Sequence, residues 1–158
     1  MKKPFLFIDT EFDGDTLLSM GLVAVFDADL ENTWEFYEVI IVRDEVIVDP
    51  WVKENVVPVF NKEPIFYPEF QEKLFTFLHR FKDNSFVLIA DWPEDISHFC
   101  KALITEPGQM VNIPSFEMKV ELIKSLDTAR LSKVPHNALE DAKALKRELM
   151  QRHKYSLY

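Results

Sequence analysis

Asp9 and Glu11 are the first residues of the chain whose types and spacing could hold a metal ion. They stand two apart, directly after the apolar run from Phe5 to Ile8. Alternate residues of a strand point to the same face, so both carboxylates would meet at the end of a strand. Hard divalent cations prefer carboxylate oxygens. In a chain with 27 Asp plus Glu among 158 residues, however, an Asp-x-Glu pair alone is more often a solvated turn.

A histidine and an acid near the C-terminus form a second candidate group. His136 directly follows Pro135 and precedes Asp141 by five residues. Proline disfavours helix at the residue before it, which predicts a helix beginning near Asn137 with Asp141 in its first turns. A neutral histidine with an ordinary pKa of about 6.5 suits a general base. A capping histidine followed by a first-turn carboxylate explains the pair equally well.

A third group lies in the middle of the chain. The apolar run from Phe86 to Ala90 has the length of a strand, and Asp91 follows it directly. Asp95 then comes two residues after Pro93, in what reads as the first turn of a helix. Without other context, one of these acids would serve as a helix N-cap and the other as a first-turn acid.

In chain order, these groups resemble the motifs of the DEDDh 3'-5' exonucleases, the DnaQ-like or RNase T-like branch of the RNase H-like fold, and in particular small bacterial or phage exoribonucleases. The first and third motifs of that family, Asp-x-Glu and a His with an Asp five residues later, are matched by Asp9, Glu11, His136 and Asp141. For the second motif the match is Asp95, with Asp91 where the family often has Asn. Which of the two binds metal stays open, and Glu117 stands where Asp is commoner.

This resemblance implies two-metal phosphodiester hydrolysis at a 3' end, with release of nucleoside 5'-monophosphates. Two Mg2+ or Mn2+ ions about 4 Å apart would be held by four acids, Asp9, Glu11, Asp95 and Asp141. His136 would then accept the proton of the attacking water. The expected substrate contacts lie beside the motifs and are Thr10, Phe12 and Trp92. Both aromatics could stack on a terminal base, although large aromatics more commonly fill cores and cleft walls.

Two other functions are compatible with the same residues. A nucleic-acid-binding module that has kept the fold would need no turnover, although all five candidate groups are present. An RNase H-like endonuclease or phosphotransfer enzyme would use the acids alone, and His136 would then be incidental. The stepwise shortening of an end-labelled oligonucleotide distinguishes an exonuclease from both.

The charge distribution predicts a short or single-stranded partner. The net charge is -9, without the basic stripe that long duplexes require. Residues 1–117 hold 9 Lys plus Arg against 22 acids, whereas residues 118–158 hold 9 against 5. The cations near the third motif that could meet phosphates are Lys119, Lys124, Arg130, Lys133, Lys143, Lys146 and Arg147. The expected partners are single-stranded RNA or DNA 3' ends, with RNA favoured by the resemblance, and a second copy in a homodimer.

Composition predicts one compact cytoplasmic domain over residues 1–158. The chain is long enough for one full core, and 47% hydrophobic residues exclude wholesale disorder. Asp9 interrupts the first apolar run after four residues, too soon for a signal peptide, and no run approaches membrane-spanning length. Cys100 is the only cysteine, which excludes an intrachain disulfide and a thiolate zinc site.

The elements that must position these groups form an α/β pattern. Three strands are predicted first, at residues 4–9, 17–27 and 33–42, with turns at 13–15 and 29–32. Later elements are a short helix or irregular segment at 51–57, a helix after Pro68, a strand at 86–90, a helix at 93–103, a strand near 111–117 and helices near 119–125 and 137–152. Antiparallel strands followed by alternating strands and helices predict an RNase H-like mixed sheet flanked by helices.

Overall fold

A five-stranded mixed sheet lies at the centre of the computed structural model, which describes residues 3–26, 33–82, 84–121 and 131–152. Its strands are β1 (Phe5–Asp13), β2 (Thr16–Val25), β3 (Thr33–Val39), β4 (Phe86–Ala90) and β7 (Phe116–Val120). Their order is β3-β2-β1-β4-β7. The first three strands are antiparallel, whereas β4 runs parallel to β1 and β7 parallel to β4. The predicted mixed sheet with an antiparallel start is therefore confirmed.

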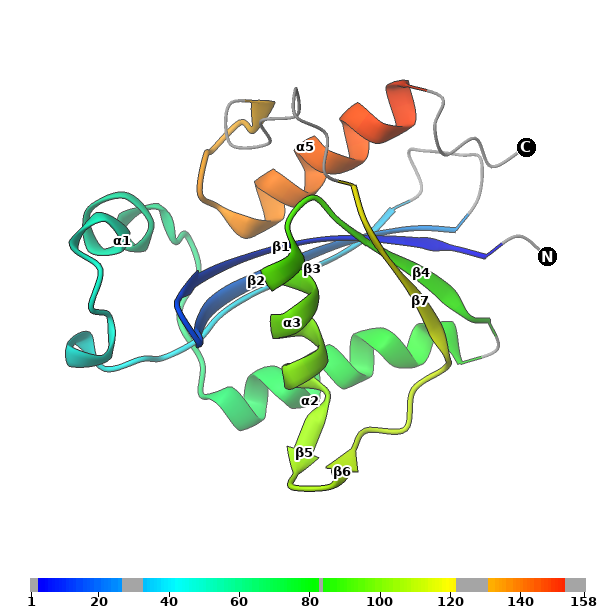
Figure 1. Cartoon of the computed structure of the whole chain (residues 1–158), viewed down its shortest axis with the longest axis horizontal. Helices are drawn as coiled ribbons and strands as arrows, with labels where there is room; N and C mark the ends of the chain where they lie inside the picture. The colour runs from blue at the N-terminus through cyan, green and yellow to red at the C-terminus, as the bar shows by residue number, and fades with distance from the viewer. Residues whose placement is uncertain (1–2, 27–32, 83, 122–130, 153–158) are drawn as a thin grey trace.

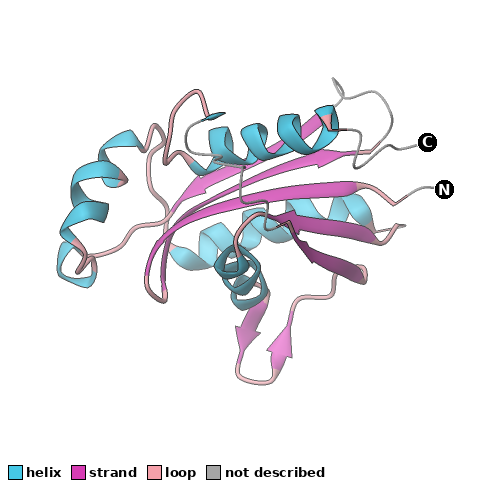
Figure 2. Cartoon of the chain, turned by 45° about the horizontal axis from the view of Figure 1, so that its top comes forward, coloured by secondary structure: helices cyan, strands magenta, loops and turns pink. Residues whose placement is uncertain are grey.

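Helices cover both faces of this sheet. They are α1 (Pro50–Asn55), α2 (Tyr67–Leu78), α3 (Pro93–Ala102) and α5 (Ala138–Gln151), with single 3-10 turns η1 (Asp44–Val46), η2 (Val57–Val59) and η3 (His79–Phe81). One face carries α5 and the other carries α2 and α3, while α1 lies beyond one end of the strands (Figures 1 and 2). No helix in the described ranges has the length and apolar character of a membrane span.

Side-chain alternation along β1 decides which residues face which helix. Leu6 and Ile8 are buried in the core with α2 and α3, whereas Phe7 is buried with α5. Asp9 and Glu11 are in phase with Phe7, so they continue the face that α5 covers. The predicted apolar stripe of α2 is also buried, through Phe70, Leu74, Phe77 and Leu78. The sheet therefore directs the first acidic pair toward the start of α5.

The segment between α3 and α5 differs from the prediction. The expected loop around Gly108 is the turn of a small hairpin, β5 (Ile104–Glu106) and β6 (Gln109–Met110). The strand expected near 111–117 lies at 116–120, where it pairs with β4 from Phe116 onward. Pro114 has no N–H to donate to a neighbouring strand, so it does not belong to the paired segment. That pairing also places the first two residues of the helix predicted at 119–125 in β7. Residues 122–125 of that helix, and the turn predicted at 29–32, lie outside the described residues.

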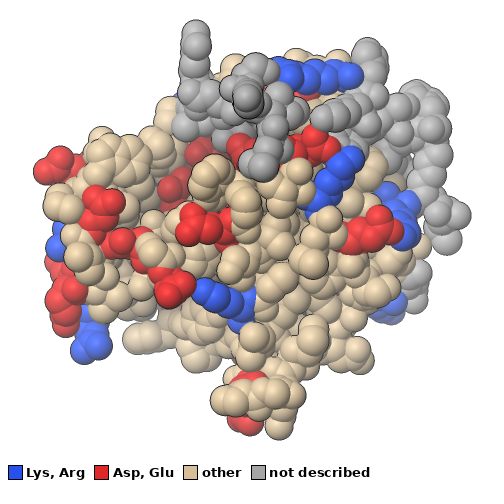
Figure 3. Space-filling model, in the orientation of Figure 1, with Lys and Arg blue, Asp and Glu red and all other residues tan. Residues whose placement is uncertain are grey.

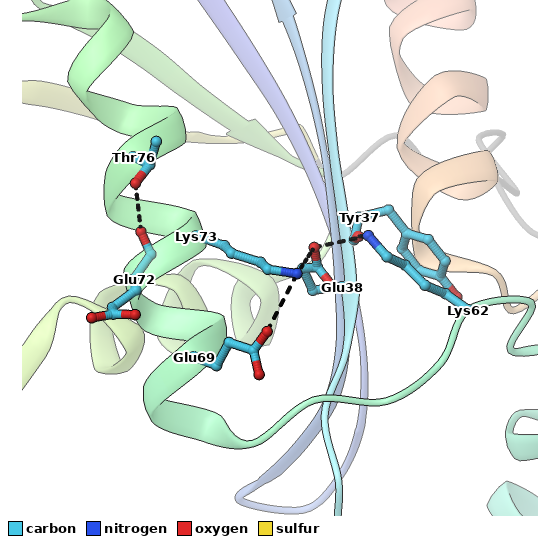
Figure 4. A network of polar contacts seen from close by, with 7 residues as sticks. All are labelled: Tyr37, Glu38, Lys62, Glu69, Glu72, Lys73 and Thr76. Atoms are coloured by element: carbon cyan, nitrogen blue, oxygen red, sulfur yellow. Dashed lines mark hydrogen bonds and ion pairs between the residues drawn. The ribbon is translucent and has the colours of Figure 1, made fainter.

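A buried acid joins α2 to the free edge of β3. Glu38 is 5% exposed, and its Oε1 lies 2.8 Å from Lys62 Nζ and 3.4 Å from Lys73 Nζ (Figure 4). Lys62 also donates a hydrogen bond to the carbonyl oxygen of Tyr37. These two lysines neutralise Glu38, and their charge is therefore committed within the fold.

Candidate active site

The predicted acids meet in two neighbouring groups. In one, carboxylate oxygens of Asp9, Asp91 and Asp95 all lie within 4.8 Å of one another. In the other, a carboxylate oxygen of Glu11, a carboxylate oxygen of Asp141 and a ring nitrogen of His136 lie equally close. The parallel strands β1 and β4 end at the same edge of the sheet, and α3 and α5 begin there. All five predicted catalytic residues are thus brought to one place.

Thr10 fixes Asp95 within this arrangement. Its backbone N–H and its hydroxyl both donate to Asp95 Oδ1, over 3.0 and 2.6 Å. Asp95 is 2% exposed and Thr10 5%. The prediction had placed Thr10 among the substrate contacts. Because the hydroxyl is buried against Asp95, the structure instead gives Thr10 a positioning role, holding the start of α3 against β1.

The junction before α5 is fixed by an asparagine cap. Asn137 Oδ1 accepts from the N–H of Glu140, and its Nδ2 donates to Tyr37 Oη and Asn61 Oδ1, each over 3.2 Å. His136 has a left-handed backbone with φ of 66°, which is uncommon for a non-glycine residue. Its N–H donates to Asp141 Oδ2 over 3.2 Å. The helix entry predicted near Asn137 is confirmed, and this network sets where His136 and Asp141 lie.

Gly21 lets α5 approach the sheet closely enough to bring Asp141 to Asp9. Gly21 pairs with Asp9 across the β1–β2 ladder. A Cβ atom at Gly21 would lie 2.4 Å from backbone atoms of Ala138 and Leu139. Those atoms belong to the first turn of α5 and cannot move without moving the helix start.

We therefore expect Gly21→Ala to destabilise the fold by about 1–3 kcal/mol. Displacement of Asp141 should also lower any metal-dependent turnover, by about ten- to a hundredfold. Urea unfolding and initial rates measure the two effects. Gly108→Ala is the matched control, because its φ of 77° also strains a side chain but the β5–β6 hairpin lies across the sheet from α5 (Figure 1). Equal activity losses in the two variants would contradict the close-approach argument.

Burial and mutual repulsion raise the pKa values of the four acids. The pKa of Asp9 is raised well above its usual value by burial first and then by the charges of Asp95, Glu11, Asp141 and Asp91. Burial followed by the charges of Asp141 and Asp95 raises the pKa of Glu11 to about 9. Burial is also the main cause that raises the pKa of Asp95 to about 7, and it raises that of Asp141. Such a group of carboxylates needs cations to ionise fully at neutral pH.

An unpaired oxygen atom supports a fit to metal ions. Asp9 Oδ2 is buried and has no hydrogen-bond partner among the described residues, whereas the Asp141 carboxylate has the Ser132 hydroxyl beside it. An unpaired buried carboxylate oxygen is costly unless a cation or donor meets it. Carboxylates with one nearby imidazole are also a donor set that suits Mg2+ or Mn2+. The residues present therefore fit divalent ions.

The raised pKa values predict how stability depends on pH. Because the folded acids bind protons more tightly than the unfolded chain, stability is fully present below their ordinary pKa values near 4 and is lost as pH rises toward 7 and 9. We expect the protein in EDTA to melt at a progressively lower temperature between about pH 5 and 9. Mg2+ should reverse much of this loss, since it binds the ionised folded form. A melting temperature that rises with pH in EDTA would contradict the assignment.

Three aromatic residues lie near the acids. Phe12 packs on His98, with ring centroids 4.6 Å apart, which is the packing role considered from sequence. Trp92 is 54% exposed and donates from Nε1 to Glu94, so its outer face is available to a ligand. Sequence reasoning missed Trp51, which is 51% exposed and stands edge-on to His136 at a centroid distance of 5.0 Å.

The end of β1 anchors the segment that carries Trp51. Asp13 Oδ2 accepts hydrogen bonds from the backbone N–H groups of Val48 and Asp49. Asp49 in turn caps α1 by accepting from the N–H of Trp51. The two acids thus hold the start of α1 against β1, which is how Trp51 reaches His136. Nothing in the sequence around Trp51 signalled this contact.

Several cations expected to meet phosphates have carboxylate or carbonyl partners. Lys143 lies 3.3 Å from Glu35 and 3.2 Å from Glu140, and Lys119 lies 3.1 Å from Glu121. Arg147 donates to the carbonyl oxygen of Leu131. Lys124 and Arg130 lie outside the described residues. On the face drawn in Figure 3, Lys and Arg are scattered among other side chains and form no continuous stripe.

Comparison with solved structures identifies the architecture. No protein-family model matches the chain, and no curated protein matches its sequence. One matching structure is described as "3'-end specific recognition of histone mRNA stem-loop by 3'-exonuclease", with a TM-score of 0.61 and 10% identity over 96% of this chain and 83% of that chain. The chain has an RNase H-like fold. At this identity the match shows the fold, and it extends over nearly the whole chain, as the motif resemblance implied.

Proposed function

We propose that this protein is a metal-dependent 3'-5' exonuclease that hydrolyses phosphodiester bonds at the 3' end of single-stranded nucleic acid and releases nucleoside 5'-monophosphates. The observation that carries the proposal is the convergence of four acids and His136 at one edge of an RNase H-like sheet. A solvated acidic surface would not bury Asp95 and Asp141 to 2% and 3% exposure.

Each residue has a distinct task in this proposal. The ions are held by four acids, Asp9, Glu11, Asp95 and Asp141. Thr10 keeps the start of α3 in position through Asp95, and Asn137 caps the start of α5. When bound, two divalent ions supply an activated water and stabilise the charge on the leaving oxygen. His136 lies close enough to Glu11 and Asp141 to accept a proton at a ring nitrogen beside them. Trp51 restricts the rotation of that ring by packing against it.

Single strands are the favoured substrate class, with RNA ahead of DNA. A long duplex needs many phosphate contacts, whereas Lys143 on α5 is already paired with Glu35 and Glu140. A strand end needs few cations, and the exposed face of Trp92 offers a surface for a terminal base. The RNA preference is supported by the matching structure, whose description names an mRNA stem-loop.

A panel of 5'-labelled RNA and DNA oligonucleotides, single- and double-stranded, tests the function with and without Mn2+. We expect stepwise shortening from the 3' end, mononucleotide products, complete arrest by EDTA, and faster decay of single strands. Retention of the strands without any product would favour a binding module. Internal cuts would favour an endonuclease. Tight duplex binding at physiological salt would contradict the charge argument.

A homodimer is also part of the proposal, because the RNase T-like enzymes that the motifs resemble are commonly dimers. A second copy would add cations near the sheet edge at which the two acidic groups of one copy gather. Sedimentation under assay conditions tests it. A fully active monomer would remove the dimer and leave the hydrolytic assignment intact.

A further inference from the structure

Asp91 belongs to the acidic group more closely than the sequence suggested. A carboxylate oxygen of Asp91 lies within 4.8 Å of carboxylate oxygens of both Asp9 and Asp95. The motif comparison left open which of Asp91 and Asp95 binds metal, because the resembling family often has Asn at the position of Asp91. In the structure both acids lie beside Asp9.

The strand register explains why Asp91 meets Asp9. β4 pairs with β1 in parallel, with Phe5 opposite Val87 and Phe7 opposite Ile89. Continuing that register by two residues places Asp91 beside Asp9. Asp91 directly follows the last residue of β4, so its position is set by the sheet as well as by the start of α3.

The alternative role considered from sequence, a helix N-cap, does not apply. The N-cap of α3 is Trp92, and no side chain makes a capping hydrogen bond there. The group also contains an independent sign that it binds a cation, because Asp9 Oδ2 is buried without a hydrogen-bond partner among the described residues.

We propose that Asp91 is a fifth metal-binding carboxylate, which with Asp9 and Asp95 forms the site of one ion while Glu11, Asp141 and His136 surround the other. This inference rests on the proposed two-metal function and extends it. The charge of Asp91 acts on both groups, since it contributes to the raised pKa of Asp9, of Asp95 and of Asp141.

The fifth carboxylate has a chemical consequence. Two divalent ions neutralise four carboxylates, so Asp91 leaves one negative charge in the loaded site. That charge strengthens the binding of the ion beside Asp9 and Asp95, and it opposes the approach of the substrate phosphate. The chain would therefore retain its metal ions at lower free concentrations than a site with Asn at this position.

Titration of the full-length protein with Mn2+, followed by calorimetry and by the electron paramagnetic resonance signal of free Mn2+, tests this assignment. The parent should bind two ions per chain. Asp91→Asn, which preserves shape and removes one charge, should retain one ion and bind the other about 10- to 100-fold more weakly. Asp44→Asn is the control, because it makes the same Asp-to-Asn change at an exposed position in η1 outside both groups, and it should bind both ions as the parent does.

The outcomes separate the inference from the function on which it rests. If Asp91→Asn binds both ions with parental affinity while the parent binds two and shortens oligonucleotides, the role of Asp91 is overturned and the exonuclease stands. If the parent binds no Mn2+, both fail. Thermal melting in EDTA guards against a folding defect, because removing one repelling charge should leave Asp91→Asn at least as stable as the parent.

Discussion

Replacement of His136 by Ala is expected to lower turnover by about two to four orders of magnitude, the usual contribution of a general base. The ring nitrogen of His136 lies within 4.8 Å of Glu11 and Asp141 oxygens, and the left-handed backbone and Trp51 fix the ring. The four acids remain in the variant, so metal binding should persist. Single-turnover rates on a 5'-labelled oligonucleotide, measured from pH 6 to 9, quantify the loss.

His79→Ala is the matched control for this experiment. His79 is an exposed histidine in η3, whose ring nitrogen contacts only the carbonyl oxygen of Phe75 among the described residues, and its removal should leave the rate unchanged. Parental rates for His136→Ala over the whole pH range would remove the base assignment. The endonuclease-like reading, which uses only the acids, would then gain support.

The positions of the acids could be predicted because they depend on short-range rules. The two-residue period of a strand places Asp9 and Glu11 on one face, and the proline before His136 sets the start of α5. These two rules act within a few residues, so the sequence contains them. The match of Asp95 came from the family resemblance, and the long-range pairing of β1 with β4 brings it to the same edge.

Contacts that support the acids could not be predicted, because they join segments far apart in the chain. Tyr37 meets Asn137 across 100 residues, and Thr10 meets Asp95 across 85. The need for glycine at position 21 arises only when α5 packs there. The choice between Asp91 and Asp95 stayed open for a similar reason. Asp91 meets Asp9 through the pairing of β1 with β4, which are about eighty residues apart in the chain.

The same acids that would perform catalysis destabilise the metal-free fold. Thr10 and Asn137 show buried polar groups that are paired by hydrogen bonds. In contrast, Asp9 Oδ2 is buried without a described hydrogen-bond partner, and neighbouring acids repel its charge. Such strain is expected at functional sites, where stability is lost in exchange for activity. A substitution that removes the charge should therefore change activity and metal-free stability in opposite directions.

Asp9→Asn tests that opposition directly. We expect turnover to fall below detection, because Asp9 lies in one ion group and is close enough to the other that the charges of Glu11 and Asp141 raise its pKa. In EDTA at pH 8 the variant should be more stable than the parent by about 1–3 kcal/mol, the cost of an unpaired buried polar group. A neutral amide can also donate hydrogen bonds to the neighbouring carboxylates. Urea unfolding with and without Mg2+ measures both stabilities.

The added Mg2+ provides the decisive comparison. It should stabilise the parent strongly and Asp9→Asn weakly, because the variant lacks a ligand that the ions need. Asp44→Asn, at an exposed position in η1 outside both acidic groups, should behave like the parent in every condition. A less stable Asp9→Asn protein in EDTA would show that the carboxylate is favourably paired, contrary to the unpaired Oδ2 atom. Retained turnover would remove Asp9 from the metal site.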